Sequence, residues 1–217
     1  MITLYSLPHS PYSSRCRIAI YHKELPIQIQ APIGGLRSSE YHALIASKKV
    51  PALVTENHTI IESSAILEYL EDRFPEHPLR ASSPEDRAEQ RALISFMDFS
   101  IAPHIFPLFK AMMKPEQRDQ LPTTVQELQE KLFVLEKLFT QSNRNTDTLD
   151  MADCGLLPSL FYAKFLMEKL GFDPLFAKTD TLDSWWQHRR EIPAVARTLD
   201  EIETGLTRFL QAYGKRS

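Results

Sequence analysis

Cysteine is scarce in this chain of 217 residues, which contains only Cys16 and Cys154. The two are far apart in the sequence, and neither belongs to a CxxC pair. A disulfide framework or a zinc site needs several cysteines at close and regular spacings. The sequence therefore predicts neither, and we expect no bound metal. We interpret both cysteines as buried core residues, because an unpaired cysteine packs as a small apolar side chain.

An excess of basic residues is also absent. The chain has 25 Lys plus Arg against 28 Asp plus Glu, and its formal net charge is −3 at pH 7. Binding to nucleic acid depends on clustered Lys and Arg, which displace the counterions of the phosphate backbone. We therefore expect no nucleic-acid partner.

Long apolar runs are missing as well. No stretch approaches the ~20 apolar residues of a membrane-spanning helix. The opening MITLYSLPHS lacks the basic start and the apolar stretch of a signal peptide. The sequence thus favours a cytoplasmic protein without a membrane partner. Its hydrophobic content of 43% is enough to build a core.

The first eighty residues alternate between strand and helix patterns. Short β-rich runs, one of which alternates apolar and polar residues, are separated by stretches of helical character. A strand–helix–strand start gives two parallel strands and a later hairpin adds antiparallel ones, so we expect a mixed sheet. The segments, in the order βαβαββα, lie at residues 2–6, 13–23, 26–30, 38–47, 50–54, 59–61 and 62–74.

The second half of the chain has helical patterns almost throughout. Asp150 and Asp153 stand three residues apart before an apolar run, which predicts a helix with a capping box, and Gly171 predicts the end of that helix. Apolar residues recur at helical spacing in two further stretches. These are Leu128, Leu132, Leu135 and Phe139, and then Leu199, Ile202, Leu206, Phe209 and Tyr213.

A proline-spaced connector, FPEHPLRASSPEDRAE, separates the two patterns. We therefore predict two domains. The first is an α/β domain at residues 1–78, and the second is an all-helical domain at residues 84–217. Residues 79–83 form the predicted linker.

Three motifs in this order resemble those of the cytosolic glutathione transferase family. SPYSSRCRIAI, at 10–20, is similar to the first helix of its serine- and cysteine-type members. KVPALVTENHTIIESSAILEYLEDRFP, at 49–75, resembles the glutathione-binding signature, and DMADCGLLP, at 150–158, resembles a buried capping motif. The resemblance implies a thioredoxin-like N-terminal domain with a four-stranded mixed sheet, an all-helical C-terminal domain, glutathione as co-substrate and a homodimer.

The resemblance also assigns residues to the backbone of glutathione. Pro51 is preceded by a cis bond in this family, and Val50 would pair its N–H and C=O with the cysteinyl part, as at a strand edge. Glu62 and Ser63 would hold the γ-glutamyl end, since a helix N-terminus presents free N–H groups that favour a carboxylate. An ordinary helix start without a ligand, with a capping residue and an acid in the first turn, explains the same two residues equally well.

The glycyl carboxylate of glutathione requires a cation at the other end of the site. Arg37 and Lys49 are the two candidates, and each is also compatible with a solvated surface charge. The chain departs from the family pattern here. Many members read Asn-Pro-x-Gly shortly before Val-Pro, whereas this sequence has LIASKKVP.

The turn HSPYSS, at residues 9–14, places Ser10 at the position of the family's catalytic serine. An unperturbed thiol has a pKa of about 8.5, and a hydrogen bond to a charged acceptor contributes about 1.5–3 kcal/mol. One hydroxyl donor can therefore lower the pKa of the glutathione thiol by roughly one to two units. Ser13 and Tyr12 are the second and third choices, and a turn that only caps the helix remains an open alternative.

The same turn argues against redox chemistry. SPYS resembles a glutaredoxin-like CPYC in which both cysteines are replaced, so the turn has no thiol to form a mixed disulfide. Isomerisation with glutathione as cofactor uses the same thiolate and belongs to the same family. The zeta-type isomerases carry Ser-Ser-Cys at this turn, however, and this sequence departs from that motif.

The resemblance also implies a second substrate, a hydrophobic electrophile. It would lie between the two halves, against a long helix that begins near Pro84. The candidate apolar wall of that helix comprises Phe96, Phe99, Ile105, Phe106 and Phe109.

A competing hypothesis is a non-enzymatic regulator of the stringent starvation protein A type, which has this fold and contacts RNA polymerase. YLEDRFPEHPL and ADCGLLPSLFY resemble segments of that protein. It lacks a serine at the position of Ser10, so its turn is not suited to hold a thiolate.

Overall fold

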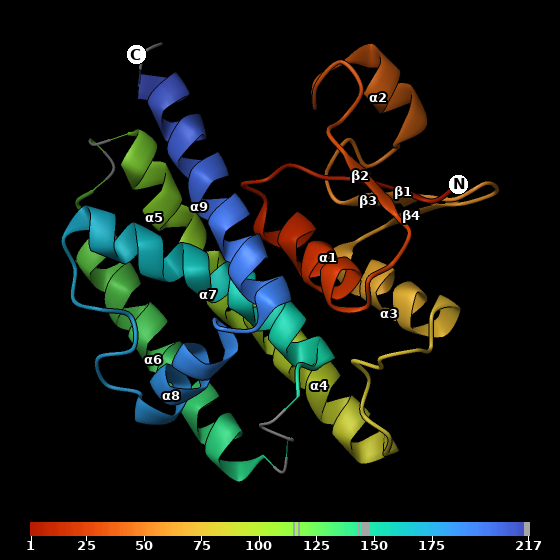
Figure 1. The fold of residues 1–217 in the computed structure, drawn as a ribbon. Helices are drawn as coiled ribbons and strands as arrows, with labels where there is room; N and C mark the ends of the chain where they lie inside the picture. Colours follow the sequence, from red (N-terminus) through yellow and green to blue (C-terminus); the bar gives the residue numbers. More distant parts are fainter. Residues whose placement is uncertain (115, 117, 143, 145–147, 215–217) are drawn as a thin grey trace.

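A sheet of four short strands forms the N-terminal part of the protein (Figure 1). The structure, a computed structural model, describes residues 1–114, 116, 118–142, 144 and 148–214. The order across the sheet is β2-β1-β3-β4, with β1 and β2 parallel and the other two pairs antiparallel. The predicted mixed sheet is confirmed. Its strands are β1 (Thr3–Tyr5), β2 (Gln28–Gln30), β3 (Ala52–Val54) and β4 (Thr59–Ile61).

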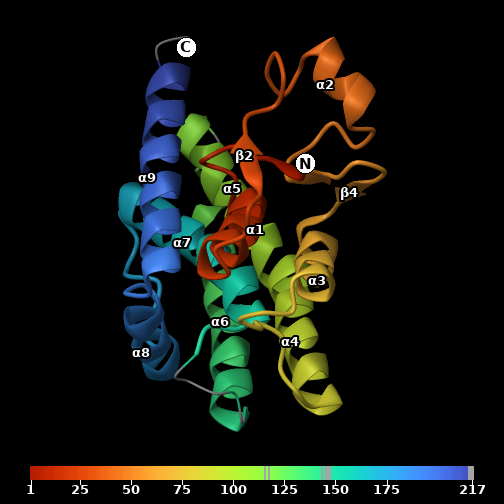
Figure 2. The ribbon, with the colours of Figure 1, turned by 45° about the vertical axis from the view of Figure 1, so that its right-hand side comes forward.

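Three helices cover the sheet and complete the predicted βαβαββα order: α1 (Pro11–His22), α2 (Ser39–Leu44) and α3 (Ser63–Arg73). Because strand side chains alternate between faces, Leu4 and Leu53 enter the main core with α1 and α3, whereas Tyr5 and Ala52 pack with Tyr41 of α2. Figures 1 and 2 show α2 on the opposite side of the strands from α1 and α3.

The remainder of the described chain is helical, which confirms the predicted fold class. Helix α1 packs against α7 and α9, so it lies between the sheet and the helical half (Figures 1 and 2). The domain boundaries at residues 78 and 84 stay a prediction. The elements are α4 (Pro84–Phe96), the π-helix η1 (Met97–Ile101), α5 (Ala102–Met113), α6 (Leu121–Gln141), α7 (Met151–Leu170), α8 (Asp180–Arg189) and α9 (Pro193–Gly214).

Helix α7 begins and ends as the sequence predicts. The Asp150 carboxylate accepts from the Asp153 N–H at 2.9 Å, and the Asp153 carboxylate accepts from the Asp150 N–H at 3.1 Å. These two bonds form the predicted capping box. Gly171 ends the helix in the left-handed conformation, with a φ of 81°.

The predicted apolar stripes of α6 and α9 face the core over most of their length. The side chain of Tyr213, in contrast, is 37% exposed. The last turn of α9 extends beyond the end of α5, so no neighbouring helix covers it (Figure 1). The buried members of the stripes are Leu128, Leu132, Leu135, Leu199, Ile202 and Leu206.

The helix that was expected to begin near Pro84 does so, with Ser83 as its N-cap. It is interrupted at η1, where the backbone makes a wider π turn. Pro103, two residues after η1, has no N–H, so it cannot donate to the carbonyl of Phe99 four residues earlier, and the helix widens there. Asp98 lies in this turn and forms an ion pair with Arg15 of α1 at 2.7 Å.

Among the described residues, the continuous stretch Pro84–Met113 is the one helical segment long and apolar enough to cross a membrane. Length and composition alone are weak evidence, because core helices of globular proteins pass the same test. Both α4 and α5 pack against α7 in this structure.

Asp153 is the centre of a buried ionic cluster. Its carboxylate accepts from the Trp185 Nε1–H at 2.9 Å and from Arg144 Nη2 at 2.6 Å, and it lies 2.9 Å from Arg189 Nε. The side chain is completely buried. The cap at the start of α7 therefore also neutralises two arginines.

The variant Asp153→Asn tests this cluster. Loss of one partner of a buried ion pair costs about 3–5 kcal/mol, whereas loss of a helix cap alone costs about 0.5–2 kcal/mol. We expect the free energy of unfolding, measured by urea denaturation, to fall by the larger amount. The exposed Asp173, changed to Asn in the same way, should have little effect. An equal and small loss in both variants would contradict the role of the cluster.

Candidate functional site

Strands β1 and β4 end, and strand β3 begins, beside the first turns of two helices at one edge of the sheet. Strand β3 pairs antiparallel with both β1 and β4, and Tyr5 and Ile61 lie opposite Ala52. Pro51, which precedes Ala52, therefore lies between the segments that follow β1 and β4. Those segments are the loop to α1 and the start of α3. Three predicted motifs, the turn before α1, the Val-Pro pair and the start of α3, are thus brought together.

Cys16 links the two helix starts directly. Its Sγ atom lies 3.9 Å from the Tyr12 carbonyl oxygen and 3.9 Å from the Ser63 carbonyl oxygen. The first turn of α3 therefore packs on the first turns of α1. Burial fixes this contact, since Cys16 is completely buried.

Val50 presents its backbone at this edge. The Val50–Pro51 bond is cis, as the family resemblance implied. Among the described residues, no backbone hydrogen bond engages the N–H or the C=O of Val50. Tyr41 holds the preceding residue in place, because its hydroxyl donates to the Lys49 carbonyl at 2.7 Å. The free N–H and C=O of Val50 can therefore pair with an extended peptide.

Ser10 is the N-cap of α1. Its Oγ accepts from the Ser13 N–H at 3.2 Å, and its own N–H donates to the Leu7 carbonyl at 3.0 Å. A hydroxyl has one proton and two acceptor positions, so this cap leaves the Ser10 proton available for another molecule. The sequence left two alternatives for Ser10, a residue that caps α1 and a residue that donates a hydrogen bond to a ligand. Ser10 can fill both roles at once.

The other two candidate hydroxyls lie in different surroundings. Ser13 is completely buried, whereas Tyr12 is 40% exposed. The Arg15 guanidinium lies 4.8 Å from the centroid of the Tyr12 ring. Burial raises the pKa of Tyr12, and the carboxylates of Asp98 and Glu62 add to this effect against that of Arg15. The Tyr12 hydroxyl therefore keeps its proton at neutral pH.

Glu62 and Ser63 form the start of α3. Glu62 is exposed and has a φ of 67°, and its side chain does not cap the helix. A left-handed conformation at a residue other than glycine costs on the order of 1–3 kcal/mol and is found preferentially at functional sites. Ser63 is buried as the first residue of the helix, where backbone N–H groups have no partner within the helix.

The two candidate cations both lie in exposed positions on the α2 side of this edge. Lys49 directly precedes Val50, and Arg37 lies in the loop that leads to the N-cap of α2 at Ser38. Both stay candidates for a ligand carboxylate.

The predicted apolar wall is divided between core and surface. Ile105 is buried in the core, whereas Phe99 and Phe106 are 82% and 58% exposed. Phe96 and Phe109 are half-buried and pack against the core. The π turn at η1 separates the residues of α4 from those of α5, so they do not form one continuous face.

An aromatic stack adjoins Ser10 on the side of the helical half. The His9 ring stacks on Phe209 of α9 with centroids 4.8 Å apart, and Phe209 stacks on Phe109 of α5 at 6.0 Å. A cavity of about 470 Å³ is lined by His9, Phe209 and their neighbours Pro8 and Gly205. Burial lowers the pKa of His9, so its ring is neutral at physiological pH.

Sequence reasoning missed the roles of two arginines in α1. Arg15 forms an ion pair with Asp98 at 2.7 Å, and Arg17 forms one with Glu201 of α9 at 3.0 Å. Both arginines are buried. The signal in the sequence was two arginines beside the apolar run Ile18–Ile20 of one helix, since buried charges require partners. Their partners lie more than eighty residues away and have no sequence signature.

Comparisons with known proteins agree with this geometry. The family model of the glutathione S-transferase N-terminal domain matches residues 4–78. The probable maleylacetoacetate isomerase 2 of Drosophila melanogaster is 30% identical over 186 residues, which cover 82% of this chain and 81% of that protein. A stringent starvation protein A homolog of Haemophilus ducreyi is 24% identical over 162 residues, 74% of each chain.

Among solved structures, a delta-class glutathione transferase of Nilaparvata lugens has a TM-score of 0.79 and 19% sequence identity to this chain, and the match covers 100% of both chains. At this level of identity the likeness concerns the fold.

The environments of Cys16 and Cys154 lead to a simple chemical test. Both thiols are buried, and burial raises the pKa of Cys16 to about 12 and that of Cys154 well above its ordinary value. Only the thiolate reacts readily, so neither cysteine should be modified by a thiol reagent such as iodoacetamide in the native protein at mildly alkaline pH. Both should react in urea. Rapid native modification of Cys16 would contradict the described packing of α1 on α3.

Proposed function

This chain belongs to the glutathione S-transferase family, and we propose that it is a cytoplasmic, glutathione-dependent enzyme. One observation carries the proposal: the free backbone of Val50, the start of α3 and the hydroxyl of Ser10 meet at a single edge of the sheet. Glutathione has a peptide backbone, a free α-carboxylate and a thiol. Each of these groups finds a partner of suitable chemistry at this edge.

In the proposed complex, glutathione extends along the bend at Pro51. The N–H and C=O of Val50 pair with its cysteinyl residue in the manner of an added strand. Ser63 and the N–H groups of the first turn of α3 receive the γ-glutamyl carboxylate, while Glu62 accepts from the ligand ammonium. Arg37 or Lys49 neutralises the glycyl carboxylate.

Ser10 acts on the sulfur. Its hydroxyl donates a hydrogen bond to the thiolate, while its oxygen keeps the cap on α1. The thiol proton is released to solvent, so the serine does not act as a base and does not become a nucleophile. The N-terminus of α1 adds a favourable dipole for the negative sulfur. Ser13 is buried and Tyr12 is further along the helix, which favours Ser10 among the three hydroxyls.

The second substrate is proposed to be a hydrophobic electrophile that approaches from the side of the stack of His9, Phe209 and Phe109. The thiolate attacks an electron-poor carbon of this molecule. In a transfer the sulfur–carbon bond is kept, and the carbon either releases a leaving group as an anion to solvent or, after addition to a double bond, leaves a neighbouring carbanion that takes a proton from solvent. In an isomerisation the thiolate adds to an activated double bond, the adduct rotates, and glutathione is expelled unchanged. The relative from Drosophila melanogaster that is 30% identical is named an isomerase, which supports the isomerisation.

A homodimer is proposed as the assembly. It rests on membership of the glutathione S-transferase family, for which the resemblance implied a homodimer. The polymerase-binding alternative rests on a relative that is 24% identical. The available proton of Ser10 favours the enzyme, because a polymerase-binding surface has no need of it.

Ser10→Ala and Ser10→Gly together test the mechanism. Both remove the hydroxyl, but glycine retains most of the N-cap stability and alanine does not. In both variants the pKa of the bound glutathione thiol, followed by its thiolate absorbance, should rise by roughly one to two units, and the dissociation constant of glutathione should change little. Ser95→Ala, on the surface of α4, serves as control. If the pKa of the bound thiol is unchanged in both Ser10 variants, Ser10 is not the donor to the sulfur, and Tyr12 or Ser13 takes its place.

Glu62→Gln tests the binding of the ligand ammonium. A hydrogen bond between charged groups contributes about 1.5–3 kcal/mol, so the dissociation constant of glutathione, measured by calorimetry, should increase at least about tenfold. Glu56→Gln, in the exposed turn between β3 and β4, should bind as the wild type does. If glutathione does not shift the melting temperature of the wild-type protein and the protein co-purifies with RNA polymerase, the proposed enzyme function is wrong.

A further inference from the structure

One side chain, Arg17 of α1, holds the whole segment that leads to Ser10. Its Nη1 donates to the Ser6 hydroxyl and to the Leu7 carbonyl, both at 3.0 Å. Its Nη2 donates to the Pro8 carbonyl at 2.7 Å and to the Ser14 hydroxyl at 2.8 Å. All four N–H groups of the two terminal nitrogens are therefore used within the protein.

Two of these partners are bonded in turn to Ser10. The Leu7 carbonyl also accepts from the Ser10 N–H at 3.0 Å, and the Ser14 hydroxyl donates to the Ser10 carbonyl at 2.8 Å. The guanidinium thus fixes the residues on both sides of Ser10. A shift of Arg17 would change the orientation of the turn and of the Ser10 hydroxyl.

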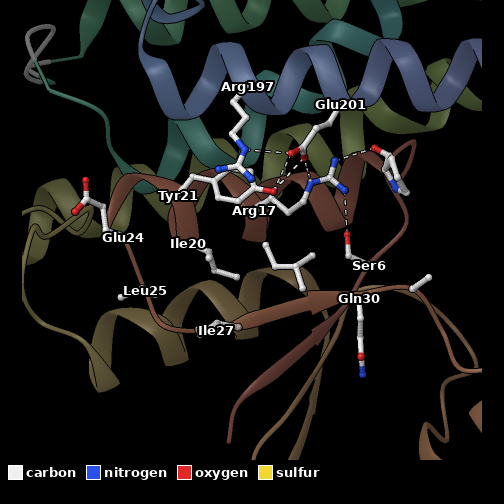
Figure 3. A pocket seen from close by; sticks show the side chains of 13 residues that line it. Ser6, Arg17, Ile20, Tyr21, Glu24, Leu25, Ile27, Gln30, Arg197 and Glu201 are labelled. Atoms are coloured by element: carbon white, nitrogen blue, oxygen red, sulfur yellow. Dashed lines mark hydrogen bonds and ion pairs between the residues drawn. The ribbon is translucent and has the colours of Figure 1, made fainter.

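Helix α9 supplies the counter-charge for this arginine. Glu201 lies 3.0 Å from Arg17 Nε and also accepts from the Tyr21 hydroxyl at 2.9 Å and from Arg197 Nε at 3.3 Å. Figure 3 shows these groups together at the wall of a groove of about 870 Å³ between α1, α9 and β2. Their polar atoms point toward one another and are joined directly, between α1 and α9 (Figure 3). Burial lowers the pKa of Arg17, and Glu201 opposes this change.

Two further contacts bring the helical half onto the same turn. The Tyr162 hydroxyl of α7 donates to the His9 carbonyl. At Gly205 of α9, an added Cβ atom would lie 2.8 Å from Pro8 Cβ and 2.9 Å from the His9 nitrogen. Real Cβ atoms essentially never lie so close to such atoms. Glycine is therefore needed for α9 to approach the turn.

We propose that Arg17, Glu201 and Gly205 are positioning residues, through which helix α9 sets the orientation of the Ser10 hydroxyl toward the glutathione sulfur. The inference rests on the proposed function, because it assigns these residues to the ionisation of bound glutathione. In the proposed complex these residues act on the turn and not on glutathione itself, since their contacts are to protein groups. Their effect passes through the carbonyls of Leu7 and Pro8 and through the hydroxyl of Ser14.

Glu201→Gln and Gly205→Ala test the proposal by independent routes. The first removes a charge and keeps the shape of the side chain, whereas the second pushes the turn and changes no charge. In both variants we expect the amides of Ser10 and Ser13 to exchange with deuterium at least about threefold faster, since their hydrogen bonds define the turn. The pKa of the bound thiol should rise toward about 8.5, with kcat reduced more than the affinity for glutathione.

Two control variants separate positioning from general destabilisation. Glu203→Gln changes an exposed charge on α9 and should leave the turn unaffected. Gly155→Ala places a Cβ atom 2.6 Å from Ile94 Cγ1, away from the turn, so it should lower the melting temperature without changing the thiol pKa. The conservative variant Glu201→Asp keeps the negative charge. The pKa of its bound thiol should therefore lie between those of the wild-type protein and Glu201→Gln.

The inference is wrong if Glu201→Gln and Gly205→Ala behave like Gly155→Ala, with a lower melting temperature but unchanged Ser10 and Ser13 exchange and an unchanged thiol pKa. That result would leave the proposed function standing, provided that the wild-type protein binds and ionises glutathione. If the wild-type protein does not bind glutathione, the proposed function fails. In that case the amide exchange still decides whether α9 orders the turn.

Discussion

The ion pair between Arg17 and Glu201 is the interaction on which the candidate site depends most. Its two residues lie 3.0 Å apart, on the first and the last helix of the fold. A buried guanidinium is unfavourable unless its charge and all its N–H groups have partners. Here the partners are one carboxylate of α9, the loop after β1 and the first turn of α1. The sheet half contributes the turn, and the helical half keeps it in place.

The sheet contributes the second constraint. A three-residue antiparallel register is enough to set Val50–Pro51 between the loop to α1 and the start of α3. The backbone of Val50 and the first turn of α3 therefore lie at the same edge of the sheet without any long loop to order them. Only Ser10 needs additional support, since it lies on a turn rather than on a strand. This division explains why the helical half reaches the turn at several points: Tyr162 and Gly205 contact it directly, and Glu201 acts on it through Arg17.

Much of the architecture was predictable from local patterns. The βαβαββα order, the mixed sheet and the capping box of α7 follow from turn residues and periodicity over short spans, and the motif resemblance pointed to the correct family. The π turn at η1 was not predicted, because the effect of Pro103 depends on where the preceding helix places the Phe99 carbonyl. The partners of Arg15 and Arg17 were not predictable either. Asp98 and Glu201 are ordinary acids in polar helix patterns, and only the packing of α1 against the helical half selects them.

The central claim is that this turn stabilises the thiolate of a bound glutathione molecule. The most direct measurement is a pH titration of the ultraviolet thiolate absorbance of glutathione bound to the wild-type protein, compared with free glutathione. The account predicts that the pKa of the bound thiol lies roughly one to two units below the unperturbed value of about 8.5. A bound thiol that titrates as free glutathione does would contradict it.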